Sequence, residues 1–226
     1  MCDRLNRCRL LFGAEKLEKL RVATVMVVGC GAVGSFAIEA LARSGIGNII
    51  LVDFDAVSES NINRQLFASD STLGRAKTEV ARERIADINP DTKVTIFDVF
   101  FDENTALPVR PDFVIDAIDT VKSKIALYKW CNTNNVPFIS SMGAARKTDP
   151  TRIKIDKISR TFACPMAREI RKIVRDERMR DFPVVFSTEM PTPHHSPDKE
   201  FGSIITVTGT FGLYMANYAI DYLAKH

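Results

Sequence analysis

Apolar and polar residues alternate along this chain in short blocks that predict strands and helices in turn. Residues 25–28 form a continuous apolar run, typical of a strand buried on both faces, and lead into Gly29-Cys-Gly-Ala-Val-Gly34. Glycines in such a G-x-G-x-x-G loop let the backbone turn tightly and approach a phosphate, and a helix over residues 35–43 would point its amino end at that phosphate. The motif predicts a nucleotide site, without separating a dinucleotide from ATP.

The same pattern continues beyond this unit. It predicts strands over residues 48–53, 92–100, 112–116 and 136–140, and helices over residues 74–88 and 121–134. Strands that alternate with helices at this spacing indicate an α/β fold with a doubly wound, mostly parallel sheet of Rossmann-like type and right-handed crossovers.

The pattern changes after Ser141. Residues 152–158 alternate basic and apolar side chains, as a half-exposed antiparallel strand would, so we expect antiparallel strands to be added from the C-terminal part. Residues 165–180 predict a basic helix that begins with proline, residues 188–200 a proline-containing loop, and residues 209–223 an apolar helix. At the other end, residues 3–20 predict a basic arm, a break at Gly13 and a short amphipathic helix.

Composition narrows the class of protein. The chain has 226 residues, of which 46% are hydrophobic and 26% charged, which fits one substantial domain. It has neither a long uninterrupted apolar segment nor a signal-peptide pattern, so we expect a cytoplasmic protein with no membrane association. Its five cysteines form no C-x-x-C pair, which argues against a disulfide framework and a four-cysteine zinc site.

The charge is unevenly distributed. The formal net charge is +3, yet residues 146–180 contain twelve Lys/Arg against five Asp/Glu. Such a segment is either a surface for a polyanion, for which tRNA is the obvious candidate, or a solvated helix face. Charge alone leaves both interpretations open.

Polar residues that follow the predicted strands indicate the chemistry. Asp53 lies at the end of the second strand, 19 residues after Gly34, where an acidic side chain accepts the ribose hydroxyls. The open-sheet rule places it at one edge of the sheet with Asn61, Arg64, Lys77, Asp116 and Asp119. Two cations able to neutralise a triphosphate and a carboxylate able to hold Mg²⁺ favour attack on the α-phosphate of ATP. Hydride transfer is disfavoured, because no Tyr-x-x-x-Lys pair occurs.

These residues resemble the ThiF/MoeB/HesA superfamily of E1-like, ubiquitin-activating-like adenylyltransferases. The motifs stand here, in the superfamily's order and spacing, as Gly29–Gly34, Val52-Asp-Phe-Asp-Ala-Val57, Ser60-Asn-Ile-Asn-Arg-Gln65, Gly74-Arg-Ala-Lys77 and Asp116-Ala-Ile-Asp-Thr-Val121. One departure is Ala32, where many relatives have glycine.

The resemblance implies roles for single residues in acyl adenylation. It implies that Gly29, Gly31, Ala32 and Gly34 hold the nucleotide, that Asp53 binds ribose, that Asn61 and Arg64 act on the phosphates, that Lys77 contacts the triphosphate and that Asp119 binds Mg²⁺. It also implies that Arg7, the second arginine of Arg4-Leu-Asn-Arg7, reaches the ATP site of the other subunit of a homodimer.

The second half resembles the tRNA threonylcarbamoyladenosine dehydratase branch of this superfamily. The resemblance rests on Asp149-Pro-Thr-Arg-Ile153, the Pro165-Met-Ala-Arg168 helix and Val184-Val-Phe-Ser-Thr-Glu189, together with the N-terminal Arg4-x-x-Arg-x-x-x-Leu-x-Gly13. It implies ATP-dependent adenylation of the threonine carboxylate on adenosine 37 of tRNA, followed by ring closure with net loss of water. The basic segment would then bind tRNA through Arg168, Arg171, Lys172 and Arg175.

We therefore expect one domain over residues 1–226: an arm and helix (1–20), a nucleotide-binding half (21–141) and a tRNA-facing, dimer-forming half (142–226). One alternative is adenylation of the C-terminal glycine of a ubiquitin-like sulfur carrier, which the absent C-x-x-C pairs and the basic second half disfavour. Another is a nucleotide-binding scaffold without catalysis. A cysteine desulfurase or sulfur-acceptor protein is a further partner that the resemblance suggests.

Overall fold

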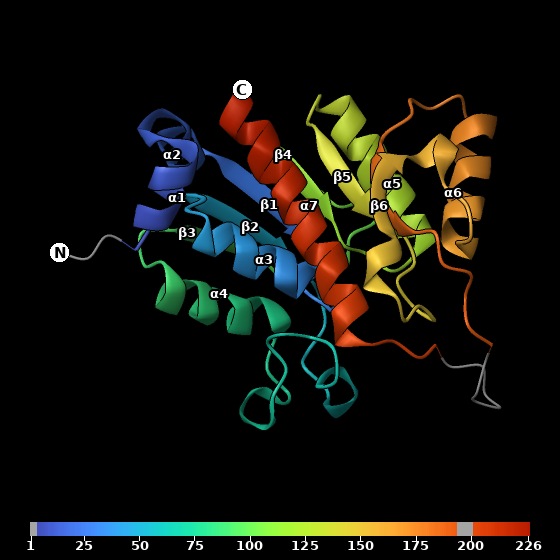
Figure 1. Cartoon of the computed structure of the whole chain (residues 1–226), viewed down its shortest axis with the longest axis horizontal. Coiled ribbons are helices and arrows are strands. Elements are labelled where there is room, and N and C mark those ends of the chain that lie inside the picture. Colours follow the sequence, from blue (N-terminus) through green and yellow to red (C-terminus); the bar gives the residue numbers. More distant parts are fainter. Residues whose placement is uncertain (1–3, 194–200) are drawn as a thin grey trace.

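A seven-stranded sheet lies between two layers of helices in the computed structural model, which describes residues 4–193 and 201–226 (Figure 1). The strand order is β3-β2-β1-β4-β5-β7-β6. The strands are β1 (Thr24–Val28), β2 (Asn48–Val52), β3 (Lys93–Phe97), β4 (Phe113–Asp116), β5 (Phe138–Ser141), β6 (Ile153–Lys157) and β7 (Pro183–Ser187). The α-helices are α1 (Asn6–Phe12), α2 (Ala14–Val22), α3 (Gly34–Arg43), α4 (Lys77–Ile88), α5 (Val121–Thr133), α6 (Pro165–Asp176) and α7 (Ile205–Lys225).

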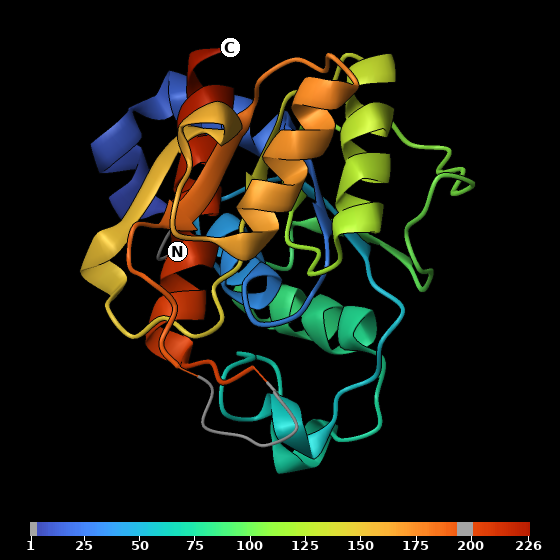
Figure 2. The same cartoon turned by 90° about the vertical axis from the view of Figure 1, so that its right-hand side faces the viewer.

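Each central strand buries both of its faces. In β1, Val25 and Val27 join the core under α3, α4 and α7, whereas Met26 and Val28 join the core under α5. Successive strand residues point to opposite faces of the sheet, so alternate residues of β1 enter opposite layers of the core. Figures 1 and 2 show α3 and α7 on one face of the sheet, with α5 and α6 on the other.

The α/β fold with a doubly wound, mostly parallel sheet is confirmed. β1 pairs in parallel with both β2 and β4, and the parallel arrangement continues through β5 to β7. The predicted antiparallel strand is β6, which pairs with β7. The sequence pattern had not identified β7 as a strand, and since β7 runs parallel to β5, β6 is the antiparallel strand of the described sheet.

Several predicted boundaries are wrong by a few residues. The helix expected over 74–88 begins at Lys77, because Gly74 has φ +78° and Ala76 forms a bridge with Ala56. The helix expected over 209–223 runs over Ile205–Lys225. Part of the expected N-terminal arm is the helix α1, and the predicted break at Gly13 is confirmed by its φ of +82°. Of the expected 188–200 loop, residues 194–200, including His194 and His195, lie outside the described residues.

The sheet changes winding direction between β1 and β4. From β1 the chain adds β2 and β3 on one side, and it then returns to add β4, β5 and β7 on the other. In open α/β sheets, ligands bind in the crevice outside the carboxyl ends of the strands at such a switch point. Among the described residues, no helix is long and apolar enough to cross a membrane.

Candidate active site

The glycine loop connects β1 to α3 at the switch point, as predicted. Gly29 has φ +93°, and its N–H donates to Val52 O at 2.8 Å. A Cβ on Gly29 would lie 2.7 Å from Ala117 O, and one on Gly34 would lie 1.8 Å from Gly29 O. The loop therefore packs backbone to backbone against the turn after β4, and only glycine fits at these two positions.

Asp53 lies directly after β2 and faces the glycine loop. Its carboxylate accepts hydrogen bonds from Cys30 N–H at 2.6 Å and from Asp55 N–H at 2.8 Å. These bonds fix its orientation and leave lone pairs for further donors, because an ionised carboxylate has about four acceptor sites. Cys30 takes part here through its backbone, and burial raises the pKa of its thiol well above the usual value.

Lys77 is the first residue of α4, and its side chain is only 8% exposed. A cation at a helix amino end is unfavourable to the helix dipole. Here Asp55 compensates, because a carboxylate oxygen of Asp55 lies 2.7 Å from Lys77 Nζ. Two of the three ammonium donors stay available for phosphate oxygens. Sequence reasoning did not select Asp55, although an Asp-x-Asp pair after a buried strand followed by a lysine at a helix start was a usable signal.

Asn61 and Arg64 lie in the segment between β2 and α4, and both make local contacts. The side-chain oxygen of the buried Asn61 accepts from Ser58 N–H at 3.1 Å. One Arg64 nitrogen donates to Ser60 O at 2.6 Å and to Asn63 Oδ1 at 2.8 Å. Asn63 in turn donates to Ser203 O, just before α7, at 3.1 Å. The segment is therefore anchored to the C-terminal part of the chain.

Asp119 and Asp116 take different positions, although both follow β4. Asp119 is exposed at the crevice. Asp116 is buried, and its carboxylate accepts from Ser140 Oγ at 2.5 Å, from Lys124 Nζ at 3.1 Å and from Ile118 N–H at 3.1 Å. Asp116 ends β4 at the predicted edge of the sheet, but it does not reach the crevice with the other polar residues, because three donors hold its carboxylate inside the protein. Asp116 shapes the turn after β4. This turn presents Asp119, and its Ala117 packs against Gly29.

Lys124 is the buried cation that balances Asp116. Burial lowers the pKa of its ammonium, and the charge of Asp116 opposes that shift. Sequence reasoning missed Lys124, because nothing in the pattern of α5 distinguishes it from the exposed Lys122 two residues earlier. A cation from α5 thus links the end of β4 to Ser140 on β5.

Arg7 lies away from the other predicted site residues. It is exposed on α1. This helix is fixed at the amino edge of the sheet, where Leu5 packs against Gly45 and Arg4 donates to the carbonyls of Asp87 and Ile88 at the end of α4. The glycine loop lies at the opposite edge, across strands of five residues that span about 17 Å. Arg7 therefore does not join the site of its own chain.

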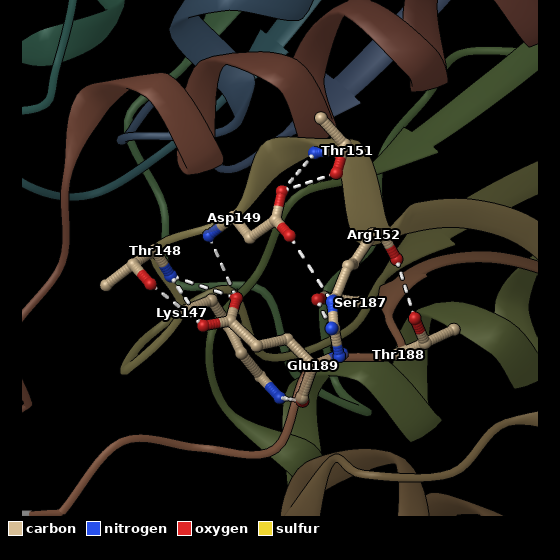
Figure 3. Close-up of polar contacts among 8 residues, drawn as sticks. All are labelled: Lys147, Thr148, Asp149, Thr151, Arg152, Ser187, Thr188 and Glu189. Carbon is tan, nitrogen blue, oxygen red and sulfur yellow. Dashed lines mark hydrogen bonds and ion pairs between the residues drawn. The ribbon is translucent and has the colours of Figure 1, made fainter.

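A polar network at the carboxyl end of β7 forms another part of the carboxyl edge of the sheet (Figure 3). The Glu189 carboxylate accepts from the N–H and hydroxyl of Thr148 and from the N–H of Asp149. Burial alone would raise the pKa of Glu189, but these hydrogen bonds outweigh it and lower the pKa. The buried Lys147 donates to the carbonyls of Ala163 and Glu189. The network joins the segment after β5 to the segment after β7, and sequence reasoning assigned it no role.

The helix α6 carries the four predicted tRNA-binding residues. Arg168, Lys172 and Arg175 are exposed, whereas Arg171 donates to the carbonyl of Thr161 at 2.7 Å and to its hydroxyl at 2.6 Å. Arg171 therefore holds the loop before the helix, and three of the four basic side chains face solvent.

The described residues form no preassembled metal site. Within residues 4–193 and 201–226, no group of three or more His, Cys, Asp or Glu side chains is close enough to hold a metal ion. Mg²⁺ in nucleotide sites is commonly bound by one or two carboxylates together with phosphates and water. The exposed carboxylate of Asp119 fits such a site.

The chain is similar in sequence to known proteins. The ThiF family model matches residues 5–226. A Bacillus subtilis (strain 168) tRNA threonylcarbamoyladenosine dehydratase is 48% identical over 195 residues, which cover 84% of this chain and 77% of that protein. A Salmonella typhimurium molybdopterin-synthase adenylyltransferase is 41% identical over 146 residues, which cover 63% of this chain and 58% of that protein.

A solved structure is similar over almost the whole chain. The Escherichia coli tRNA N6-threonylcarbamoyladenosine dehydratase TcdA in complex with ATP superposes with a TM-score of 0.91 at 36% identity, covering 98% of this chain and 94% of that one. Its complex with AMP gives a TM-score of 0.93 and also covers 98% of this chain and 94% of that one. The similarity therefore includes the second half of the chain as well as the first.

Proposed function

The chain belongs to the ThiF family, and we propose that it is an ATP-dependent enzyme that adenylates the threonine carboxylate of threonylcarbamoyladenosine 37 in tRNA and then closes it to the cyclic form. One observation carries this proposal over the sulfur-carrier alternative. The sequence similarity to the Bacillus subtilis dehydratase is 48% identity over 84% of the chain, whereas that to the molybdopterin-synthase adenylyltransferase is 41% over 63%.

The proposed reaction has two steps. A carboxylate oxygen of the substrate attacks the α-phosphorus of ATP, and pyrophosphate leaves. A nitrogen of the same threonylcarbamoyl group then attacks the acyl carbon, loses its proton and displaces AMP. The substrate thereby loses the elements of one water, because its carboxylate oxygen leaves in AMP and the proton of the nitrogen is released to solvent. No enzyme nucleophile is needed, because the substrate supplies the attacking group, and the polar side chains at the crevice serve to bind and orient.

The nucleotide site is proposed at the carboxyl edge of β1, β2 and β4. The glycine loop and the amino end of α3 would receive the phosphates, and Asp53 would accept the ribose hydroxyls. Lys77 keeps two free donors beside its bond to Asp55, which suits a contact with the triphosphate. Arg64 would neutralise charge that develops on the phosphates, and Asn61 would donate a hydrogen bond to a phosphate oxygen. Mg²⁺, held by Asp119 together with ATP, would polarise the phosphate oxygens.

We propose a homodimer in which Arg7 completes the ATP site of the partner subunit. Its location at the amino edge, opposite its own glycine loop, supports action between subunits. Exposed apolar side chains offer surface for association, namely Leu10 and Leu11 on α1 and Leu213 and Tyr214 on α7. A cytoplasmic location follows from the proposed substrates, ATP and tRNA. A cysteine desulfurase or sulfur-acceptor protein is a further candidate partner, testable by co-purification.

The test incubates the protein with ATP, Mg²⁺ and threonylcarbamoyl-modified tRNA, digests the tRNA to nucleosides and determines their masses. We expect the modified nucleoside to lose the mass of one water, with AMP formed in equal amount. A parallel reaction replaces the tRNA with a ubiquitin-like sulfur carrier ending in glycine. AMP formation with the carrier, and unchanged nucleoside mass with the tRNA, would support the alternative function instead.

A further inference from the structure

A cavity of about 350 Å³ lies at the amino edge of the sheet, opposite the proposed ATP site. Phe113, Phe138 and Pro183, the first residues of β4, β5 and β7, all line it. None of the proposed catalytic residues does. The cavity therefore needs an explanation of its own.

The walls of the cavity are aromatic. On one side of the sheet, Phe113 packs against Tyr222 with ring centroids 5.3 Å apart. On the other side, Tyr128 packs against Phe182 at 4.7 Å and against Phe138 at 5.3 Å. Tyr218 and Tyr222 are half-buried, and since His226 stacks on Tyr222 with ring centroids 4.3 Å apart, Tyr218 is the ring that offers surface to an occupant. Such walls suit a flat, aromatic ligand.

The rim of the cavity carries polar groups that are not used within the protein. The side chains of Asn132, Asn135 and Arg180 are exposed and line the cavity. Within residues 4–193 and 201–226 these three side chains make no hydrogen bond or ion pair, whereas Asp181 beside them is bonded to Ser159. Carboxamides pair with the edges of nucleobases, and a guanidinium binds phosphate. A base with its phosphate matches this combination better than a purely apolar ligand.

The helix α6 joins this cavity to the proposed active site. Its amino end lies beside Gly143, just after β5 at the carboxyl edge, where Cys164 Sγ is 4.0 Å from Gly143 O. Its carboxyl end leads through Arg180 to the start of β7 at the amino edge, and Figure 2 shows the helix along the face of the sheet beside α5. Twelve residues span about 18 Å.

The exposed cations of α6 form a track along that path. Arg168, Lys172 and Arg175 are spaced by four and three residues, so they lie on one face of the helix. A phosphate backbone that follows them from the active site arrives at Arg180 and the aromatic cavity. Proteins that bind unpaired RNA combine such a basic track with aromatic side chains on which bases stack.

We propose that this cavity receives an unstacked nucleobase of the tRNA substrate, a second base site about one helix length from the modified adenosine. The proposal rests on the proposed function, because it assumes that tRNA is the substrate. The base stacks on Tyr218, the carboxamides of Asn132 and Asn135 contact its edge, and Arg180 binds the adjoining phosphate.

The test uses the full chain and threonylcarbamoyl-modified tRNA, with binding measured by filter retention over a range of salt concentrations. We expect Tyr218→Leu to weaken binding about 5- to 20-fold with an unchanged salt slope, because it removes stacking and no charge. Arg180→Ala should weaken binding and reduce the slope by about one. Arg110→Ala is the matched control, an exposed arginine at the same edge of the sheet that does not line the cavity.

A second measurement locates the base directly. With 4-thiouridine placed at successive unpaired positions of the tRNA, light-induced crosslinks should map to peptides containing residues 132–138 or 218–222. Variants that bind tRNA like the unchanged protein, or crosslinks only to other peptides, overturn the base site while leaving dehydration intact. Absence of both tRNA binding and dehydration in the unchanged protein overturns the proposed function and this inference together.

Discussion

The ammonium of Lys124 lies 3.1 Å from a carboxylate oxygen of Asp116, and both side chains are at most 3% exposed. Asp116 also accepts from Ile118 N–H, so this ion pair fixes the turn that precedes Asp119 and packs against Gly29. This buried ion pair therefore supports two parts of the proposed ATP site, Asp119 and the glycine loop.

Lys124→Met should destabilise the protein by about 3–5 kcal/mol, because it leaves the Asp116 carboxylate buried without its cation. The double variant Lys124→Met/Asp116→Asn should recover part of that loss, since it removes both charges. Urea unfolding measures the effect, and Lys122→Met on the exposed side of α5 is the matched control. Equal stability of the Lys124 and Lys122 variants would contradict the role assigned to the pair.

The two glycines of the nucleotide loop should respond differently to alanine. Gly34→Ala places a methyl group 1.8 Å from Gly29 O, so we expect a lower melting temperature and loss of ATP binding. At Gly31 a Cβ would meet Gln65 at 3.6 Å, an ordinary contact, so Gly31→Ala should fold normally. It should nevertheless weaken ATP binding about tenfold, because the second glycine lets the backbone approach the phosphates. Calorimetry measures the melting temperature and the ATP affinity of each variant. Normal ATP binding by Gly31→Ala would show that the phosphates do not lie against Gly31.

Asp119→Ala should abolish ATP-dependent AMP release while leaving the melting temperature unchanged, because this side chain is exposed. A loss of at least about a hundredfold is expected if its carboxylate holds the metal ion of the reaction. Asp91→Ala, an exposed aspartate before β3, is the control. Retained AMP release in the Asp119 variant would show that the metal ion is held by another residue.

The basic face of α6 should set the salt dependence of tRNA binding. Three single variants replace Arg168, Lys172 or Arg175 with alanine. Each should reduce the salt slope of tRNA binding by about one, since each removes one phosphate contact. Arg171→Ala should instead lower the melting temperature, because Arg171 holds Thr161. Lys93→Ala on β3 is a control for general charge. Unchanged slopes in all three variants would show that this face of the helix is a solvated surface that does not contact tRNA.

Glu189 should make stability depend on pH. Hydrogen bonds from Thr148 and Asp149 hold the pKa of its carboxyl below the usual 4.5, so its contribution is present above that value. The contribution is lost as the pH falls through the lowered pKa. Glu189→Gln should therefore cost about 1 kcal/mol at pH 7, and the difference should vanish in acid. Thermal melting from pH 7 to pH 3 measures this, with the exposed Glu103→Gln as control. A pH-independent difference would contradict the mechanism.

The local pattern of the sequence determined the fold class and most of the proposed nucleotide site. Continuous apolar runs identify doubly buried strands, and glycines at Gly29 and Gly34 are required by the close backbone approaches that the structure contains. The spacing of Asp53 from that loop follows from the length of a strand-helix-strand unit. These features depend on short stretches of chain, so they can be read from the sequence.

Tertiary structure decided what depends on neighbours from distant parts of the chain. Nothing local distinguishes Lys124 from Lys122, Asp116 from Asp119 or Arg171 from Arg175. In each pair one side chain meets buried or backbone partners and the other faces solvent. The same holds for the cavity at the amino edge, whose walls come from β4, β5, β7, α5 and α7. Burial and partner choice arise only when separate elements pack, so the sequence alone identified the chemistry, and packing determined which side chains are free to perform it.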